Sequence, residues 1–223
     1  MPTIPKYLIK FLADLKENNN REWFISNKST YESARKEFMT FVDALIVELA
    51  KADTSIAHLT AKDCVFRIYR DVRFSTDKSP YKTNIGAYIS AASRKTEIRD
   101  MAGYYIHISP GDSMLAGGAY MPQGPWLQAI RQEIAYNPDE FISIIQSPEF
   151  TKYFGTMEGE KLIKAPKGYA ADHPLIGLLR HKSFLAMHTL SDEKVISDEF
   201  FNHCINVFRA MLPFNSFLNR SID

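Results

Sequence analysis

The strongest constraint on the fold of this chain is a change in the spacing of its apolar residues. Near the N-terminus, apolar side chains recur every three or four positions, which is typical of an amphipathic helix. In the middle third they alternate with polar residues, as in a strand with one buried face, and after residue 122 the helical spacing returns. The pattern predicts an α+β fold, with helices from both ends of the chain packed on an antiparallel sheet.

Turn-forming residues separate the expected elements, and the apolar patterns give their ranges. The strands are expected at 64–70, in a meander at 82–91, 103–109 and 113–121, and at 183–190. The helices are expected at 8–15, 29–51, 124–136, 138–147, 174–181, and from a cap at Ser197 to a stop at Pro213. Residues 155–172 are expected to form a loop. No repeat or low-complexity linker divides the chain, so a single domain over 1–223 is expected.

Composition excludes several classes of protein. The 223 residues are 45% hydrophobic and 13% aromatic, so the chain can bury a core and is not disordered. A net charge of +1 argues against bulk attraction to nucleic acid or membranes. We find neither a signal peptide nor an apolar run long enough to span a bilayer. Cys64 and Cys204 belong to no CxxC pair, which favours reduced thiols and a cytoplasmic protein.

Charge is concentrated in one segment. Between Lys62 and Arg99, nine basic and four acidic residues give +5, so the rest of the chain carries −4. A local excess of positive charge in a nearly neutral protein indicates a focused site for an anion. The centre of the segment is FRIYRDVRFSTDKSPYK, residues 66–82.

Three arginines within this stretch are candidates to grip one anion, because a guanidinium group matches the geometry of phosphate and carboxylate. Asp71 and Asp77 would hold the arginines in place, and the arginines beside Asp71 should depress its pKa and make it an orienting group rather than a base. Lys78, Tyr81 and Lys82 complete the expected anion-binding site. Its predicted residues are Arg67, Arg70, Asp71, Arg73, Asp77, Lys78, Tyr81 and Lys82.

His107 is the candidate acid or base. It lies with Tyr105 on the expected polar face of the sheet, near Tyr88. The alternative is a half-buried histidine whose hydrogen bonds are satisfied. The six histidines show no metal-binding spacing, and the chain has no nucleotide-binding glycine loop, so neither a metal nor a cofactor is predicted.

Three functions from different classes are compatible with these residues. The first is binding, with or without turnover, of a small phosphate- or carboxylate-bearing molecule. In the second, the Arg–Asp motif is an ion-pair staple in a non-enzymatic structural or adaptor protein. The third is binding of single-stranded nucleic acid, with Trp23, Tyr69 or Tyr88 stacking on bases. The sequence decides neither the oligomeric state nor whether a reaction is catalysed.

The central motif also resembles that of a known family. The string Arg67-x-x-Arg70-Asp71-x-Arg73-Phe74-x-x-Asp77-Lys78-x-x-Tyr81 is similar to RxxRDxRFxxx[DN]KxxY, the hallmark of a bacterial family of conserved hypothetical proteins, domain of unknown function 2461. This chain has one residue fewer between Phe74 and Asp77. The similarity extends over nearly the whole chain, including the segments 19–32, 103–122, 130–134 and 172–184. The resemblance implies a single-domain protein and brings no activity or catalytic residue with it.

Overall fold

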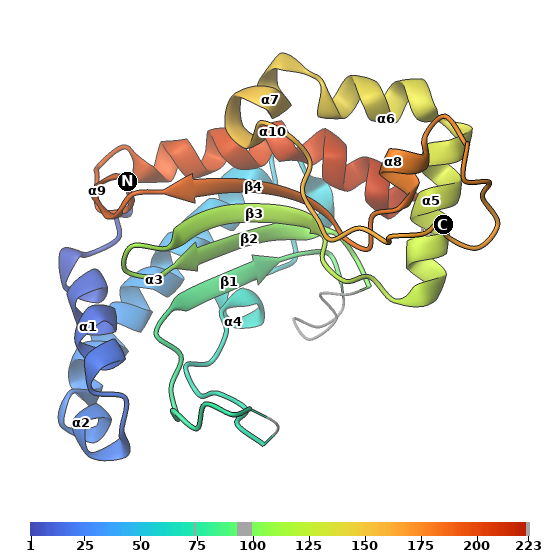
Figure 1. Cartoon of the computed structure of the whole chain (residues 1–223). Helices are drawn as coiled ribbons and strands as arrows, with labels where there is room; N and C mark the ends of the chain where they lie inside the picture. Colours follow the sequence, from blue (N-terminus) through green and yellow to red (C-terminus); the bar gives the residue numbers. More distant parts are fainter. Residues whose placement is uncertain (74, 93–99, 222–223) are drawn as a thin grey trace. The chain divides into compact units, whose positions relative to one another are not determined.

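A four-stranded antiparallel sheet occupies the middle of the chain, as the alternating apolar pattern predicts (Figure 1). The computed structural model describes residues 1–73, 75–92 and 100–221. The strands lie in chain order, β1-β2-β3-β4. Their bounds are Ile85–Ile89 for β1, Gly103–Ile108 for β2, Ser113–Ala119 for β3 and Phe184–Leu190 for β4. The α+β class, the meander and the strand near 183–190 are therefore confirmed.

The chain divides into two compact units. Unit 1 comprises Met1–Ile89, Tyr105–Leu115 and Thr189–Asn206, and unit 2 comprises Ser90–Tyr104, Ala116–His188 and Val207–Asp223. Because the boundaries fall inside β2, β3, β4 and a C-terminal helix, this division does not by itself define folding domains. The single domain over 1–223 stays a prediction.

Unit 1 is built on two amphipathic helices. The stripe of α1 (Lys6–Glu17) buries Leu8, Phe11, Leu12 and Leu15, and the stripe of α3 (Lys28–Leu49) buries its apolar residues from Ala34 to Leu49. Phe41 on α3 contacts the rings of Phe200 and Phe201 at centroid distances of 5.6 and 5.4 Å. Burial of one such side chain stabilises the fold by roughly 1.5–3 kcal/mol. Unit 1 also contains α2 (Arg21–Ser26), η1 (Thr54–Ile56), α4 (Ala61–Cys64), α9 (Asp192–Val195) and the start of α10 (Phe200–Arg220).

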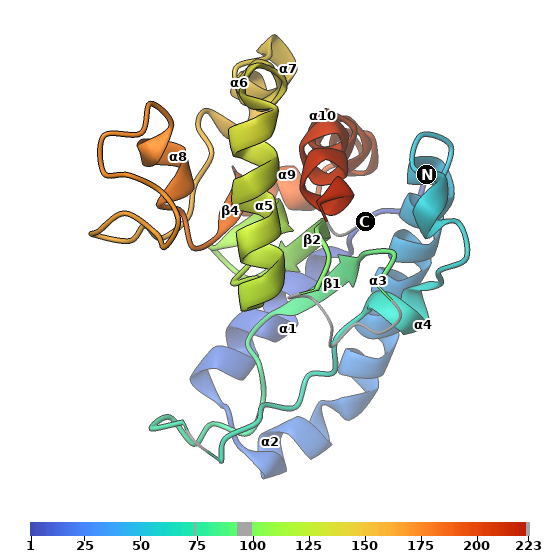
Figure 2. The same cartoon turned by 90° about the vertical axis from the view of Figure 1, so that its right-hand side faces the viewer.

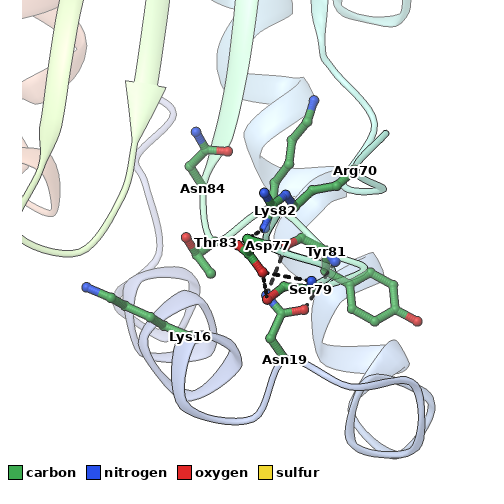
Figure 3. Close-up of a pocket in the computed structure, with 9 residues that line it drawn as sticks. All are labelled: Lys16, Asn19, Arg70, Asp77, Ser79, Tyr81, Lys82, Thr83 and Asn84. Carbon is green, nitrogen blue, oxygen red and sulfur yellow. Dashed lines mark hydrogen bonds and ion pairs between the residues drawn. The ribbon is translucent and has the colours of Figure 1, made fainter. Parts of the chain in front are cut away.

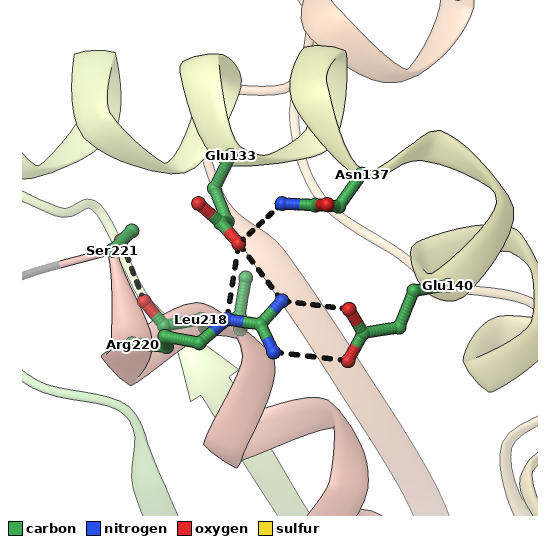
Figure 4. A network of polar contacts seen from close by, with 6 residues as sticks. All are labelled: Glu133, Asn137, Glu140, Leu218, Arg220 and Ser221. Atoms are coloured by element: carbon green, nitrogen blue, oxygen red, sulfur yellow. Dashed lines mark hydrogen bonds and ion pairs between the residues drawn. The ribbon is translucent and has the colours of Figure 1, made fainter.

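Unit 2 contains the remaining helices. They are α5 (Gly124–Tyr136), α6 (Pro138–Ile145), α7 (Pro148–Phe154), α8 (Ile176–Leu179) and the rest of α10. All but α7, which was not predicted, lie at or near the expected positions. Phe141 on α6 packs against Phe214 and Phe217 of α10 at centroid distances of 6.1 and 4.9 Å. At the end of α10, Arg220 binds the carboxylates of Glu133 on α5 and Glu140 on α6, with N–O distances of 2.8–3.0 Å (Figure 4).

The expected strand at 64–70 is the main correction to the fold. Thr60 and Asp63 form a capping box that starts α4, so residue 64 ends a helix. The part of the following chain that the structure describes pairs at isolated antiparallel bridges, between Val65 and Ala87 and between Tyr69 and Tyr81. Pro80 beside the second bridge has no N–H to donate, which limits the extension of a ladder there. Residues 65–84 therefore form a long connection between α4 and β1 (Figure 2).

The C-terminal helix also differs from its prediction. Pro213 lies inside α10 instead of ending it, and the helix begins at Phe200 rather than at a Ser197 cap. The Ser197 hydroxyl instead donates to the Lys194 carbonyl at 2.8 Å. Phe214, Phe217 and Leu218 beyond the proline are buried, and their burial offsets the backbone hydrogen bond that proline removes. Neither α10 nor any other described helix is long and apolar enough to cross a membrane.

Candidate functional site

Unit 1 contains a polar pocket where Arg70 and residues 77–84 lie near the C-terminal end of α1. Its volume is about 390 Å³, within the range of small-ligand sites. Figure 3 shows the residues that line it: Lys16, Asn19, Arg70, Asp77, Ser79, Tyr81, Lys82, Thr83 and Asn84. Three cations and one carboxylate are therefore present in the lining.

The segment is fixed to α1 through Asn19, just beyond the helix. The Asn19 amide nitrogen donates to the Tyr81 carbonyl at 2.9 Å, and its oxygen accepts from the Tyr81 N–H at 3.1 Å. The buried Tyr81 ring stacks on Phe24 with a centroid distance of 4.0 Å, and it points away from the Arg70–Asp77 pair (Figure 3). Tyr81 thus anchors the wall of the pocket, although the sequence suggested that it orients a ligand.

Arg70 and Asp77 form an ion pair in the pocket lining. Arg70 Nη1 donates to Asp77 Oδ2, while the Ser79 hydroxyl and N–H donate to Asp77 Oδ1 at 2.6 and 2.9 Å. The hydrogen bonds from Ser79, followed by the one from Arg70, hold the pKa of Asp77 well below its usual value. The carboxylate thus stays charged and fixes the position of the half-buried guanidinium group.

The other two cations have no carboxylate partner among the described residues. Lys16 is exposed at the last turn of α1. Lys82 is half-buried, and its Nζ lies 5.3 Å from the centroid of the Phe66 ring. Burial lowers the pKa of Lys82, and the nearby positive charge of Arg67 lowers it further. An ammonium group in this environment is poorly compensated, so the described lining carries a net positive charge.

A short polar chain leads from the pocket to the sheet. The amide nitrogen of Asn84 lies 2.9 Å from Nδ1 and 3.3 Å from Nε2 of His107, and the hydroxyl of Tyr105 lies 2.8 Å from the same Nδ1. Burial lowers the pKa of His107 and raises that of Tyr105 to about 12. A Cβ on Gly86 would lie 3.3 Å from the Tyr105 hydroxyl and 2.9 Å from a backbone oxygen. Glycine at this position therefore leaves room for the tyrosine to reach His107.

Half of the predicted ligand-binding residues line the pocket, namely Arg70, Asp77, Tyr81 and Lys82. Arg73 instead binds Asp71 at 2.6 and 2.9 Å on the surface, and this hydrogen bonding lowers the pKa of Asp71 to about 2. Lys78 donates to the Val72 carbonyl at 2.9 Å. Arg67 is exposed and contributes charge near Lys82. The expected convergence of three guanidinium groups is thus reduced to Arg70 at this pocket.

Some residues of the site could not be assigned from the charge pattern. Lys16, Asn19, Ser79, Thr83 and Asn84 line the pocket in addition to the predicted residues. The run of three asparagines ending α1 signalled only a helix stop. Phe74 of the central motif, and Arg94, Lys95, Glu97 and Arg99 of the basic segment, lie outside the described residues.

The lining is suited to bind an anion. Guanidinium and ammonium groups donate strong, charge-assisted hydrogen bonds to phosphate or carboxylate oxygens. The hydroxyl of Thr83 adds a group that can donate. Within residues 1–73, 75–92 and 100–221, no three His, Cys, Asp or Glu side chains are grouped as metal ligands.

Comparison with known proteins identifies one family. No curated protein and no solved structure matches the chain. The sequence model of the family described as "Conserved hypothetical protein (DUF2461)" matches residues 7–217, which is nearly the whole chain. The match includes every residue that lines the pocket. The chain therefore belongs to the conserved hypothetical protein family of domain of unknown function 2461.

Proposed function

We propose that the pocket of unit 1 binds a small molecule through a phosphate or carboxylate group. The observation that carries this proposal is the imbalance of charge in the lining. Among the described residues of the lining, Arg70, Lys16 and Lys82 are opposed by Asp77 alone, and Asp77 is already hydrogen-bonded to Ser79 and Arg70. A bound anion would supply the counter-charge that Lys82 lacks among the described residues.

The residues have distinct roles in this proposal. Lys82 contributes the central charge, because its half-buried ammonium group is shielded from water and interacts more strongly with an anion than an exposed one does. Arg70, held by Asp77, supplies a guanidinium group of fixed orientation. Lys16 at the end of α1 adds attraction from the exposed side of the pocket.

The test is calorimetric titration of the full-length protein with inorganic phosphate and with malonate, at fixed ionic strength. We expect saturable binding of at least one of them. Lys82→Gln should weaken it by about tenfold or more, because a charge-assisted hydrogen bond to a bound anion is lost. Lys10→Gln is the matched control for Lys16→Gln: both lysines are exposed on α1, but Lys10 pairs with Asp14 and lies outside the lining.

The control separates a local site from general electrostatics. Lys16→Gln should weaken binding several-fold, while Lys10→Gln should leave it within about twofold, because distant surface charges are screened by salt. Equal effects of the two substitutions, or no binding by the unmodified protein, would contradict the proposal.

A second function is favoured by the two Arg–Asp pairs. Arg70–Asp77 and Arg73–Asp71 both lie within the 65–84 connection, as expected of an ion-pair staple in a structural or adaptor protein. If the motif serves only stability, Arg70→Gln should lower the melting temperature and the protein should bind neither phosphate nor malonate. If the pocket binds a ligand, Lys82→Gln should weaken binding by about tenfold or more without lowering the melting temperature.

Nucleic-acid binding is the third candidate, and the aromatic side chains favour it least. Tyr88 is buried, and Trp23 packs against Phe11 with a centroid distance of 5.6 Å. Of the three proposed stacking residues, only Tyr69 is exposed, at 54% of its surface. Binding of a short single strand that weakens with salt would revive this candidate. A bacterial source and a cytoplasmic location also stay predictions.

A further inference from the structure

The amide of Asn84 is shared between the pocket and His107. Its nitrogen lies within 2.9 Å of the imidazole, and Figure 3 shows its oxygen on the side of Lys82. In this orientation Asn84 offers the pocket a hydrogen-bond acceptor. An acceptor opposes the binding of an anion, whereas the other end of the same amide would favour it.

The protonation state of His107 determines which end faces the ring. A neutral imidazole keeps one lone pair in its plane, and in the tautomer that has this lone pair on Nδ1 the Asn84 NH₂ and the Tyr105 hydroxyl both lie within donating distance of it, at 2.9 and 2.8 Å. A protonated imidazole has no such lone pair and presents two N–H donors. The Asn84 NH₂ would then meet a donor, and a half-turn of the amide would place its oxygen against the ring instead. That same half-turn directs the NH₂ toward the pocket.

We propose that His107 is a positioning residue for the anion site: by gaining a proton it reverses the Asn84 amide, so that the pocket gains a donor and holds oxyanions more tightly in acid. The proposal rests on the proposed function, since it assigns a direction to a group in the same pocket. His107 does not line the pocket, so it acts through Asn84.

The groups around His107 indicate that the imidazole itself is the group that changes its charge in the neutral range. On its own strand, Tyr105 keeps its proton across the neutral range, because burial raises its pKa to about 12. Asp112, in the turn after β2, opposes the effect of burial and favours the protonated imidazole. From the segment before β1, Asn84 is uncharged. The pKa of Lys82, two residues before Asn84, is lowered by burial and further by the charge of Arg67.

These groups determine whether protonation of His107 strengthens or weakens binding of the anion. Burial lowers the pKa of His107 from 6.5, so the free protein holds it neutral near pH 7. An anion that prefers the reversed amide raises this pKa, and by reciprocity the added proton strengthens binding of the anion. Affinity should therefore rise as the pH falls toward and through the pKa of His107.

Sulfate is the probe of choice, because its own charge does not change in this range. Calorimetric titration of the full-length protein between about pH 8 and pH 5 should show affinity rising toward acid, by at most about tenfold per pH unit for one linked proton. His107→Gln, which cannot titrate, should bind sulfate with an affinity that does not change with pH. Sulfate binding that is measurable but independent of pH in the unmodified protein would overturn this inference and leave the proposed function intact. Absence of sulfate binding at every pH would overturn this inference, and the proposed function would fail with it only if phosphate and malonate do not bind either.

A second measurement distinguishes the effect of reversing the Asn84 amide from simple Coulomb attraction between protonated His107 and the anion. The pKa of His107, followed by NMR of its ring protons, should rise when sulfate is added. Asn84→Leu keeps the size of the side chain and removes the reversible amide, so the rise should become smaller. An equal rise in Asn84→Leu would show that Coulomb attraction alone links the two groups, and would refute the role given to Asn84.

Discussion

Arginine is used differently in the two units. Arg220 in unit 2 binds two carboxylates, Glu133 and Glu140 (Figure 4). Its guanidinium group also lies 4.9 Å from the centroid of the Phe217 ring. Arg70 in unit 1 binds one carboxylate, Asp77, in a pocket that holds two more cations. The first arrangement has an excess of negative charge around its arginine, and the second an excess of positive charge.

This difference shows that the balance of charge, rather than the presence of an Arg–carboxylate pair, distinguishes a structural contact from a candidate binding site. Hydrogen bonds from Arg220 lower the pKa of Glu140, just as those from Ser79 and Arg70 lower the pKa of Asp77. A carboxylate with a depressed pKa therefore does not identify a site here. What separates the two regions is Lys82 in unit 1, which has no carboxylate partner within residues 1–73, 75–92 and 100–221.

The largest effect is expected from Arg220→Gln. It should reduce the free energy of unfolding by about 1–2 kcal/mol, since two partly exposed ion pairs are lost and each contributes up to about 1 kcal/mol. Urea denaturation measures this change, and phosphate binding should not be affected. The matched control is Arg209→Gln, which removes an exposed arginine from the same helix. Equal destabilisation by both substitutions would show that the network adds nothing specific.

Asp77→Asn should strengthen binding of phosphate, whereas the loss of a cation should weaken it. It removes the only carboxylate of the described lining, so the affinity for phosphate should rise several-fold in a titration at low salt. Asp71→Asn is the control, because Asp71 lies outside the lining and binds Arg73. A loss of affinity in Asp77→Asn would show that Asp77 matters more for holding Arg70 in place than for its charge.

The Arg220 network should also have a pH dependence of known sign. The folded pKa of Glu140 lies below its usual 4.5, chiefly because Arg220 donates hydrogen bonds to it. Its contribution to stability is therefore fully present above pH 4.5 and is lost as the pH falls through the folded pKa. The stability difference between the unmodified protein and Arg220→Gln should narrow over that window. In a Glu140→Gln background, this difference in stability should decrease less over the same pH range. An equal decrease would show that a group other than Glu140 causes the effect.

The architecture could be predicted from the sequence because burial leaves a local pattern. The stripe of Leu8, Phe11, Leu12 and Leu15 identifies α1 without knowledge of its partners. The strand at 64–70 and the stop at Pro213 were wrong for a shared reason. Both depend on competition between a local preference and contacts from elsewhere, namely the α4 capping box and the buried rings beyond Pro213.

The candidate site could be predicted only where it is local in sequence. Arg70, Asp77 and Lys82 fall within one basic segment, so charge density identifies them. Asn19 and Lys16 reach the pocket because Asn19 binds the backbone of Tyr81, 62 residues away, and no pattern in the sequence encodes that distance. For the same reason Arg73 was predicted to bind the anion, because proximity in sequence does not show that its side chain binds Asp71 on the surface.

The smallest effect is expected from Arg73→Gln, and it tests the role of the motif directly. Both members of the Arg73–Asp71 pair are largely exposed, with 76% and 49% of their side-chain surfaces accessible, so water replaces the lost contact with little change in stability. The melting temperature and the affinity for phosphate should both equal those of the unmodified protein within error, in differential scanning fluorimetry and calorimetry. A clear fall in melting temperature alone would show that the Arg73–Asp71 pair serves to stabilise the fold. A fall in affinity alone would mean that Arg73 leaves Asp71 to contact the ligand, and unit 1 would then regain the second guanidinium group that the sequence predicted.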